Sequence, residues 1–264
     1  MTTVVDLQET AFNALDELCS SLTPDEWTKR TDCPGWDVKD NLSHIIGTES
    51  SMLGRPAPDH DPGEKPWIRN PIGANNEIQV DYRRSRTPEQ VLDEFREVSG
   101  ERMKVLRSMS DADLDAESWT PIGQGTVRDM VAIRVMDCWV HEQDIRRAVG
   151  KPGGLTGPVA EHAFGRHSQA MGFVVGKKAG APDGTTVVFD VAGFGEVPIG
   201  VEGKRANRLD SVPESADVKL SMDLETFNCL CCGRGDPAAL SSRVQITGDD
   251  GLARSILENM NFMI

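Results

Sequence analysis

The sequence lacks the features of several protein classes. It has no run of about 18 apolar residues, the length that a membrane-spanning helix needs, and its first residues lack the basic and apolar segments of a secretory signal. Basic residues are scarce as well, since 28 lysines and arginines stand against 42 acidic residues, for a net charge of −14. Nucleic-acid binding needs clustered basic residues. We therefore expect neither a nucleic-acid nor a membrane partner, and a cytoplasmic location.

Cysteine is present, but not in a pattern that indicates disulfides or a zinc knuckle. Six cysteines occur in a chain without an export signal, and Cys229, Cys231 and Cys232 lack the spacing of two CxxC pairs. We expect reduced and mostly buried thiols. With 38% hydrophobic and 27% charged residues over 264 positions, the chain can bury a sizeable core. A globular protein of one large or two ordinary domains is expected.

Residues 1–152 have the periodicity of a helical domain. Apolar residues recur at helical spacing in four segments, which are residues 4–22, 37–53, 87–109 and 126–149. Four helices of this length predict a bundle. The segment between the second and third helices, residues 54–76, is rich in proline, glycine and asparagine, and we expect it to be a long loop that is functional or mobile.

The ends of two of these helices carry recognisable signals. Asp37 can cap the second helix, with Asp40 at its third position, and Thr126 can cap the fourth, with Asp129 at its third position. Gly150 is placed to end the fourth helix. The bundle helices are therefore expected to begin and end at these residues.

Residues 158–264 have a different pattern. The segment before them, residues 150–158, is rich in glycine and is the expected linker. A helical segment follows, then two strands that can form a hairpin, a third strand, a helix, a fourth strand and a closing helix. This order predicts a small domain of ordinary size. The expected fold class is thus α+β, with an N-terminal four-helix bundle over residues 1–152 and a small α/β domain over residues 158–264.

The fourth helical segment places two polar residues where a bundle helix should be apolar. Asp137 and His141 are four residues apart and share one stripe with Met130 and Ile145. Burying a carboxylate without a partner is costly. Two explanations remain open at this point: a hydrogen bond between the aspartate and the histidine, or a metal ion that both bind.

A third candidate ligand lies on the second helix. His44 is flanked by Leu42 and Ile45, where a histidine can simply be a satisfied core residue. Facing helices of a bundle can also pool their ligands, and His44, Asp137 and His141 together make a set of two histidines and one carboxylate. Such a set leaves coordination positions open, which is typical of a catalytic metal. We expect the other histidines to be exposed or partly buried polar residues: His60, His162 and His167.

Two segments resemble the signatures of a known family. "CPGWDVKDNLSHIIGTE" (residues 33–49) and "DCWVHEQDIRRAVG" (residues 137–150) are similar to segments of the DinB-like four-helix-bundle metalloenzymes, specifically the mycothiol-dependent maleylpyruvate isomerase family. The segment from Leu220 to Met260 resembles the sterol-carrier-like C-terminal domain of these proteins. The resemblance covers nearly the whole chain and implies a DinB-like bundle followed by a sterol-carrier-like domain.

The resemblance also implies a metal and a thiol. In the family a divalent ion, usually zinc, is held by a histidine of the second helix and by an acid and a histidine one turn apart on the last bundle helix, which correspond to His44, Asp137 and His141. The family often has glutamate at the acid position, so Asp137 is one methylene shorter. The implied cosubstrate is mycothiol, a low-molecular-weight thiol. In an isomerase its thiolate adds to a cis double bond, allows rotation and leaves; in a transferase it stays attached to the electrophile.

The C-terminal segment suggests one further site residue. Arg234 matches an "F-x-x-L-x-x-G-R" pattern of the family. The resemblance implies that Arg234 is a catalytic and cofactor-binding residue, whose guanidinium binds a carboxylate of the substrate or cofactor. The alternative is that Arg234 forms a salt bridge on the surface. Asp144 and Arg146 either support the ligand turn or form an ion pair on the helix surface. Trp36 is expected to be a packing residue.

The sequence therefore predicts a two-domain enzyme in which a divalent metal activates mycothiol toward a small-molecule electrophile, as an isomerase or an S-transferase. Two alternatives stay open. One is a non-enzymatic module that binds a small molecule or lipid and has a structural metal, and the other is a thiol-independent zinc hydrolase. The chain is expected to be a monomer or a homodimer.

Overall fold

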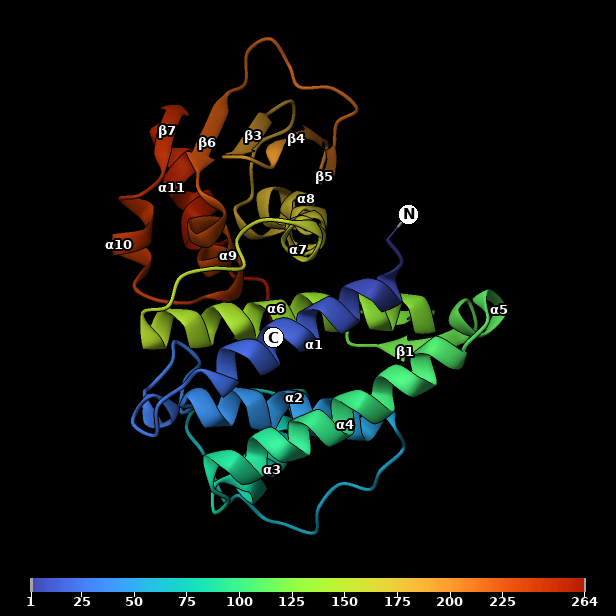
Figure 1. The fold of residues 1–264 in the computed structure, drawn as a ribbon. Helices are drawn as coiled ribbons and strands as arrows, with labels where there is room; N and C mark the ends of the chain where they lie inside the picture. Colours follow the sequence, from blue (N-terminus) through green and yellow to red (C-terminus); the bar gives the residue numbers. More distant parts are fainter. Residues whose placement is uncertain (1, 264) are drawn as a thin grey trace. The chain divides into compact units, whose positions relative to one another are not determined.

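The computed structural model describes residues 2–263 of the chain. The fold class is α+β, as the sequence predicts, and the chain divides after Ala160 into two compact units. The first unit is helical, and the second is built on a five-stranded sheet (Figure 1). None of the helices within residues 2–263 is both long and apolar enough to cross a membrane.

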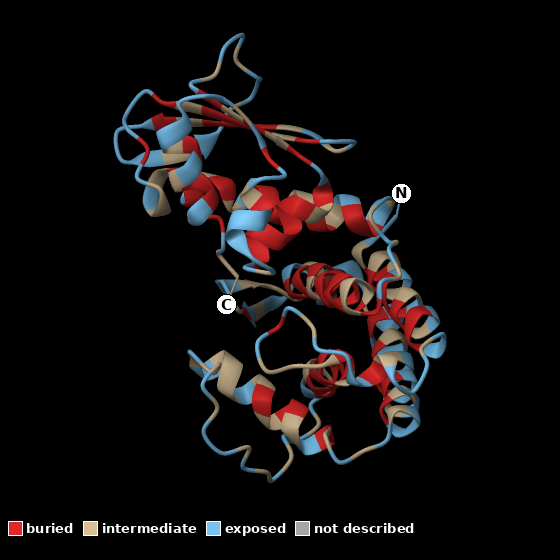
Figure 2. Ribbon diagram, turned by 90° about the vertical axis from the view of Figure 1, so that its left-hand side faces the viewer, coloured by how far each residue is buried: buried red, intermediate tan, exposed pale blue. Residues whose placement is uncertain are grey.

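The first unit contains four long helices. α1 (Val4–Ser20) packs against α4 (Pro88–Ser108) and α6 (Val127–Val149), while α2 (Val38–Met52) packs against α4 and α6 from the other side. Buried residues, red in Figure 2, occupy most of α2 and α6. These two helices are therefore the ones that can bring side chains together inside the bundle.

Side chains at the helix ends explain where these helices begin and end. Asp37 and Asp40 form a capping box at the start of α2, and Thr126 and Asp129 form one at the start of α6. α6 ends at Gly150, whose left-handed backbone (φ 70°) suits glycine because it lacks a Cβ. The ends read from the sequence thus agree with the structure.

The expected loop over residues 54–76 is partly wrong. Its last six residues, 71–76, begin a further helix, α3 (Pro71–Arg83), which packs against α2. Asn70 caps this helix and Pro71 occupies its first position. The asparagine and proline that suggested a loop are therefore part of a helix start. A one-turn 3₁₀ helix (Glu26–Thr28), the short helix α5 (Asp111–Leu114) and the hairpin of β1 (Glu117–Thr120) and β2 (Gly123–Thr126) complete the unit.

The second unit begins with α7 (Pro158–Gln169), α8 (Met171–Phe173) and a π-helical turn (Val174–Lys178). Its sheet has the strand order β5-β4-β3-β6-β7, in which only the β3–β6 pair is parallel. The strands are β3 (Thr186–Val191), β4 (Gly195–Glu202), β5 (Arg205–Arg208), β6 (Val218–Met222) and β7 (Gln245–Gly248). The helices α9 (Leu224–Cys232), α10 (Pro237–Ser241) and α11 (Asp250–Glu258) follow β6 and β7. β5 and α10 are not foreseen from the sequence.

Candidate metal centre

The candidate centre lies between α2 and α6, where polar side chains of the two helices face each other. On α6, Arg134, Asp137, His141 and Asp144 follow one another at steps of three or four residues, so they share one face of the helix. Ile145 on the same stripe and Val140 beside it are fully or almost fully buried. The stripe therefore lies in the interior of the bundle, where its charges need partners.

The structure brings the three predicted ligands together. His44 Nε2 lies 3.2 Å from Asp137 Oδ2, and His141 Nε2 lies 3.7 Å from Asp137 Oδ1. One ligand atom from each of the three residues lies within 4.8 Å of the others. Both histidines are about nine-tenths buried or more, with 5% and 6% exposure. Two imidazoles and a monodentate carboxylate at this spacing suit a divalent ion with metal–ligand distances of about 2.0–2.2 Å.

The electrostatics of the centre are dominated by a buried arginine. Arg134 donates to Glu49 Oε1 through its Nε (2.7 Å) and also contacts Asp137 Oδ2. Burial by itself raises the pKa of Asp137, but Arg134, followed by His141 and His44, outweighs it and holds the pKa well below its ordinary value. Burial also lowers the pKa of His44, against the pull of Asp137. An ionised carboxylate beside an uncharged imidazole is the state in which both can bind a metal.

A tryptophan from the turn before α2 lies against both histidines. The Trp36 ring is centred 5.2 Å from the His44 ring and 5.9 Å from the His141 ring. Its Nε1 donates to Glu77 Oε2 (2.9 Å), and the Nε1 of Trp67 donates to the same oxygen (3.0 Å). Trp36 therefore does more than fill the core, because it forms a wall of the centre and is anchored by a buried carboxylate of α3.

The same turn explains a glycine. Gly35 has φ 80°, and a Cβ at this position would lie 2.3 Å from Trp67 Cε2. The turn that carries Trp36 therefore packs directly under Trp67, which belongs to the segment between α2 and α3. Only glycine satisfies both the backbone angle and this close approach.

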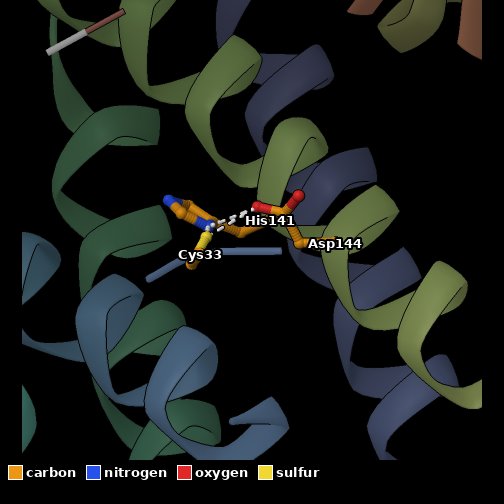
Figure 3. Close-up of side chains that lie close together, drawn as sticks. All are labelled: Cys33, His141 and Asp144. Atoms are coloured by element: carbon orange, nitrogen blue, oxygen red, sulfur yellow. Dashed lines mark hydrogen bonds and ion pairs between the residues drawn. The ribbon is translucent and has the colours of Figure 1, made fainter. Parts of the chain in front are cut away.

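Polar side-chain atoms also surround the other ring nitrogen of His141, and Figure 3 shows two of these residues, Cys33 and Asp144, beside it. Its Nδ1 lies 2.8 Å from Asn41 Oδ1, 3.2 Å from Asp144 Oδ2 and 3.8 Å from Cys33 Sγ. Cys33 Sγ in turn lies 3.0 Å from Asp144 Oδ2. Asp144 is fully buried and also contacts Arg147, so the alternative of a surface ion pair is wrong for Asp144. Arg146, by contrast, pairs with Glu142 at 2.7 Å.

Arg234 lies in the second unit, just after α9. Its backbone N–H donates to the carbonyl of Cys229 (2.8 Å), and its Nη1 donates to the carbonyl of Cys232 (3.0 Å). These contacts cap the C-terminal end of α9, where Gly233 has a left-handed backbone (φ 62°). The guanidinium is thus held close to its own helix end, and its role as an anion-binding residue stays a prediction.

Sequence reasoning missed several residues of the centre. In the sequence, Glu49 and Arg134 look like any charged residues on a helix. Only the structure shows that both are buried together. Asn41 and Cys33 precede His44 by three and eleven positions, and no spacing rule links them to His141. One expectation is wrong in the second unit: His167 is fully buried rather than exposed or partly buried, and its Nε2 lies 3.0 Å from Asn228 Oδ1.

Comparisons with known proteins place this chain in a family. The family model described as the mycothiol maleylpyruvate isomerase N-terminal domain matches residues 9–146, and the model of the corresponding C-terminal domain matches residues 161–255. Two crystal structures of the mycothiol-dependent maleylpyruvate isomerase, one of a His-to-Ala mutant, have TM-scores of 0.55 and 0.54 at 19% and 18% identity. Each comparison covers 94% of this chain and 96% of the other chain, and at this identity it supports the fold alone.

Curated relatives add little about activity. Two uncharacterized proteins of Mycobacterium tuberculosis are 24% identical to this chain over 138 residues, which is 52% of this chain and 52% of each relative. The chain therefore spans about half the length of the curated relatives it matches. The N-terminal family model alone covers more than half of the 264 residues, and the two models follow one another in the expected order. On these matches, the chain belongs to the mycothiol maleylpyruvate isomerase family.

Proposed function

We propose that this protein is a metal-dependent thiol enzyme that uses mycothiol as cosubstrate and acts on a small electrophile. The observation that carries the proposal is the convergence of His44, Asp137 and His141 inside the bundle, within 4.8 Å of one another. Two imidazoles and one carboxylate suit zinc and related divalent ions and leave coordination positions open. A divalent ion held there would lower the pKa of a bound thiol, which makes the thiol a nucleophile at neutral pH.

The chain's own residues would prepare the centre for this ligand. Arg134 balances the charge of Asp137 and keeps it ionised, and Glu49 holds Arg134 in place at 2.7 Å. Trp36 covers one side of both imidazoles and limits the access of water. The result is a largely buried and charged site, in which electrostatic interactions are stronger than in water.

The proposed reaction is the isomerisation of a small cis-unsaturated acid, in keeping with the family name. The thiolate sulfur forms a bond to one carbon of the double bond while the π electron pair moves onto the conjugated carbonyl as an enolate. Rotation follows about the resulting single bond. The enolate then re-forms the double bond as the carbon–sulfur bond breaks, which releases the trans acid and the thiolate. Arg234 is our proposed partner for a carboxylate of the substrate or of the thiol, through the paired N–H groups of its guanidinium. An S-transferase would share the first step and omit the last.

Metal content and thiol dependence test the proposal together. The protein is purified without chelator, its metal is measured by elemental analysis, and maleylpyruvate turnover is followed with and without mycothiol. We expect about one divalent ion per chain and turnover only when the thiol is present. Recovery of free mycothiol after the reaction indicates isomerisation, whereas consumption of one thiol per product indicates transfer.

Two outcomes would contradict the proposal. Low metal in both the wild type and His141→Ala would favour a binding module without a catalytic ion. Turnover of an ester or amide without any added thiol would favour a hydrolase that uses metal-bound water.

A further inference from the structure

The hydrogen bonds around Asn41 determine which way its amide faces. Asn41 Nδ2 lies 2.8 Å from the backbone carbonyl of Asp37, a group that can only accept. The same nitrogen lies 2.9 Å from Thr31 Oγ1. The Thr31 hydroxyl donates its only proton to the carbonyl of Trp36 (3.1 Å), so its oxygen must accept from Asn41. Two acceptors therefore fix the amide nitrogen on this side.

The amide oxygen of Asn41 must then face His141. Asn41 Oδ1 lies 2.8 Å from His141 Nδ1, and an amide oxygen only accepts hydrogen bonds. The nearby Asp144 Oδ2, 3.2 Å from the same nitrogen, also accepts when it is ionised. His141 Nδ1 is thus surrounded by acceptors and has to carry a proton. A neutral imidazole with its proton on Nδ1 has its lone pair on Nε2, the nitrogen that faces Asp137.

We infer that Asn41 is the positioning residue that fixes the tautomer of His141 and so presents Nε2 to the metal. The chain of hydrogen bonds begins at the backbone carbonyls of Trp36 and Asp37 and ends at His141 Nδ1, the ring nitrogen opposite the candidate ligand atom Nε2. Asn41 is fully buried and lies one turn before His44 on α2, so one helix supplies both a ligand and the residue that orients the other histidine. That Nε2 binds a metal rests on the proposed function; the tautomer itself does not.

This assignment also accounts for Cys33 and Asp144 without a second ion. Cys33 Sγ lies 3.0 Å from Asp144 Oδ2 and 3.4 Å from Asn41 Oδ1, both acceptors, so the thiol keeps its proton and donates it. His141 Nδ1 and Cys33 Sγ therefore each donate one proton, and the side chains of Asn41 and Asp144 accept them. The alternative, a thiophilic ion bound by Cys33, His141 Nδ1 and Asp144, would need both protons removed.

The metal-free wild-type protein provides the first test. Two-bond ¹⁵N–¹H spectra of protein labelled at histidine report which ring nitrogen carries the proton. We expect the Nδ1–H form for His141, identified by the loss of its signals in His141→Gln. The Nε2–H form would overturn the inference, as would a sulfur-to-cobalt charge-transfer band that appears on addition of Co²⁺ and is lost in Cys33→Ser.

Variants of Asn41 provide the second test. In Asn41→Leu we expect a mixture of tautomers and a Zn²⁺ affinity about 10- to 100-fold lower, the usual effect of losing a group that orients a metal-binding histidine. Asn41→Asp keeps the acceptor that faces His141 and should retain the Nδ1–H form. It loses the N–H groups that donate to the Asp37 carbonyl and to Thr31, so its Zn²⁺ affinity should lie between those of the wild type and Asn41→Leu. Ser43→Ala is the matched control, because Ser43 is equally buried on α2 and its hydroxyl has no hydrogen-bond partner within residues 2–263.

The two proposals fail in different ways. A wild-type protein that shows the Nδ1–H form but binds no Zn²⁺ would remove the proposed metal and leave the role of Asn41 in fixing the tautomer. Unchanged tautomer and affinity in Asn41→Leu, with normal Zn²⁺ binding, would remove the role of Asn41 and leave the proposed metal.

Discussion

Each unit of the molecule buries histidine, but the surroundings differ. In the first unit, His44 and His141 lie beside Asp137, Arg134 and Asp144, all charged side chains. In the second unit, His167 lies beside Asn228 Oδ1 (3.0 Å) and Cys232 Sγ (3.9 Å), and its ring contacts those of Phe227 and Phe262. His167 lies beside an amide and a thiol, whereas a histidine that lies beside a buried carboxylate can bind a cation.

The pKa values express the same difference. Burial lowers the pKa of His167 to about 4, and the hydrogen bond to Asn228 opposes it only in part. Burial lowers the pKa of His44 too, but there the carboxylate of Asp137 pulls in the other direction. Burial of a histidine is therefore not evidence of function on its own. The carboxylate that accompanies it distinguishes the two regions.

The largest expected effect comes from removing a ligand in the first unit. His141→Ala should weaken Zn²⁺ binding by about 3 to 5 kcal/mol, roughly a quarter to a third of the 10–16 kcal/mol that a complete protein zinc site provides. Equilibrium dialysis against a competing chelator measures this loss. The matched variant His167→Ala should bind Zn²⁺ as the wild type does. Equal losses in both variants would show that the comparison between the two regions is wrong.

The second effect is a loss of stability of the second unit in acid. The pKa of His167 is about 4 in the folded chain and 6.5 by its ordinary value, so the unfolded chain takes up the proton first as the pH falls. The contribution of His167 to the free energy of unfolding should be constant above about pH 7 and should fall between about pH 6.5 and pH 4, by about 3 kcal/mol in all. Hydrogen exchange of the β3 amides measures it. In His167→Gln this dependence should disappear, and a dependence unchanged from the wild type would contradict the assignment to His167.

Much of the fold could be predicted because its signals are local. The capping boxes at Asp37 and Thr126 and the glycine at the end of α6 depend on residues within a few positions of one another. The helix α3 was missed because Asn70 and Pro71 are as common in loops as at helix starts, and its apolar stripe is weak. The residues close to Asn70 and Pro71 in the sequence therefore could not show whether the pair begins a helix or continues a loop.

The candidate centre could be predicted only in part, for the same reason. Asp137 and His141 are one helical turn apart, so their proximity follows from the sequence. Pairing them with His44 rested on the expectation that facing bundle helices pool their ligands, and the family resemblance strengthened it, because nothing local relates α2 to α6. The partners of the ligands lie farther away: Glu49 meets Arg134 across 85 positions, and Asn41 meets His141 across 100. Such contacts depend on the packing of the helices, which the sequence pattern does not specify.

The third effect concerns Arg234 and tests whether the second unit contributes more than structure. Arg234→Ala should weaken binding of the anionic ligand by about 1.5 to 3 kcal/mol, the usual range for a hydrogen bond to a charged group. Arg234→Lys should recover only part of this, because an ammonium group cannot form the paired hydrogen bonds of a guanidinium. Calorimetric titration with mycothiol and with maleylpyruvate measures both. Arg243→Ala is the control, since Arg243 pairs with Asp223 in the same unit. Unchanged affinity in Arg234→Ala would end the proposed role.

The smallest expected effect concerns the cysteines of the first unit. Burial raises the pKa of the Cys138 thiol to about 12, so this group is protonated at neutral pH and is a poor nucleophile. Cys33 hydrogen-bonds to Asp144, and a serine hydroxyl can donate to the same oxygen. Cys33→Ser should therefore change Zn²⁺ binding and stability by less than about 1 kcal/mol, the net value of one ordinary hydrogen bond.

Both cysteine variants should keep most of the mycothiol-dependent turnover, because the nucleophilic sulfur is proposed to come from the cosubstrate. Steady-state kinetics with the wild type, Cys33→Ser and Cys138→Ser at equal metal content measure this. Complete loss of turnover in either variant, with metal and fold intact, would move the nucleophile from mycothiol into the protein. For Cys33 it would also change the comparison between the two regions, because the thiol beside His141 would then be reactive.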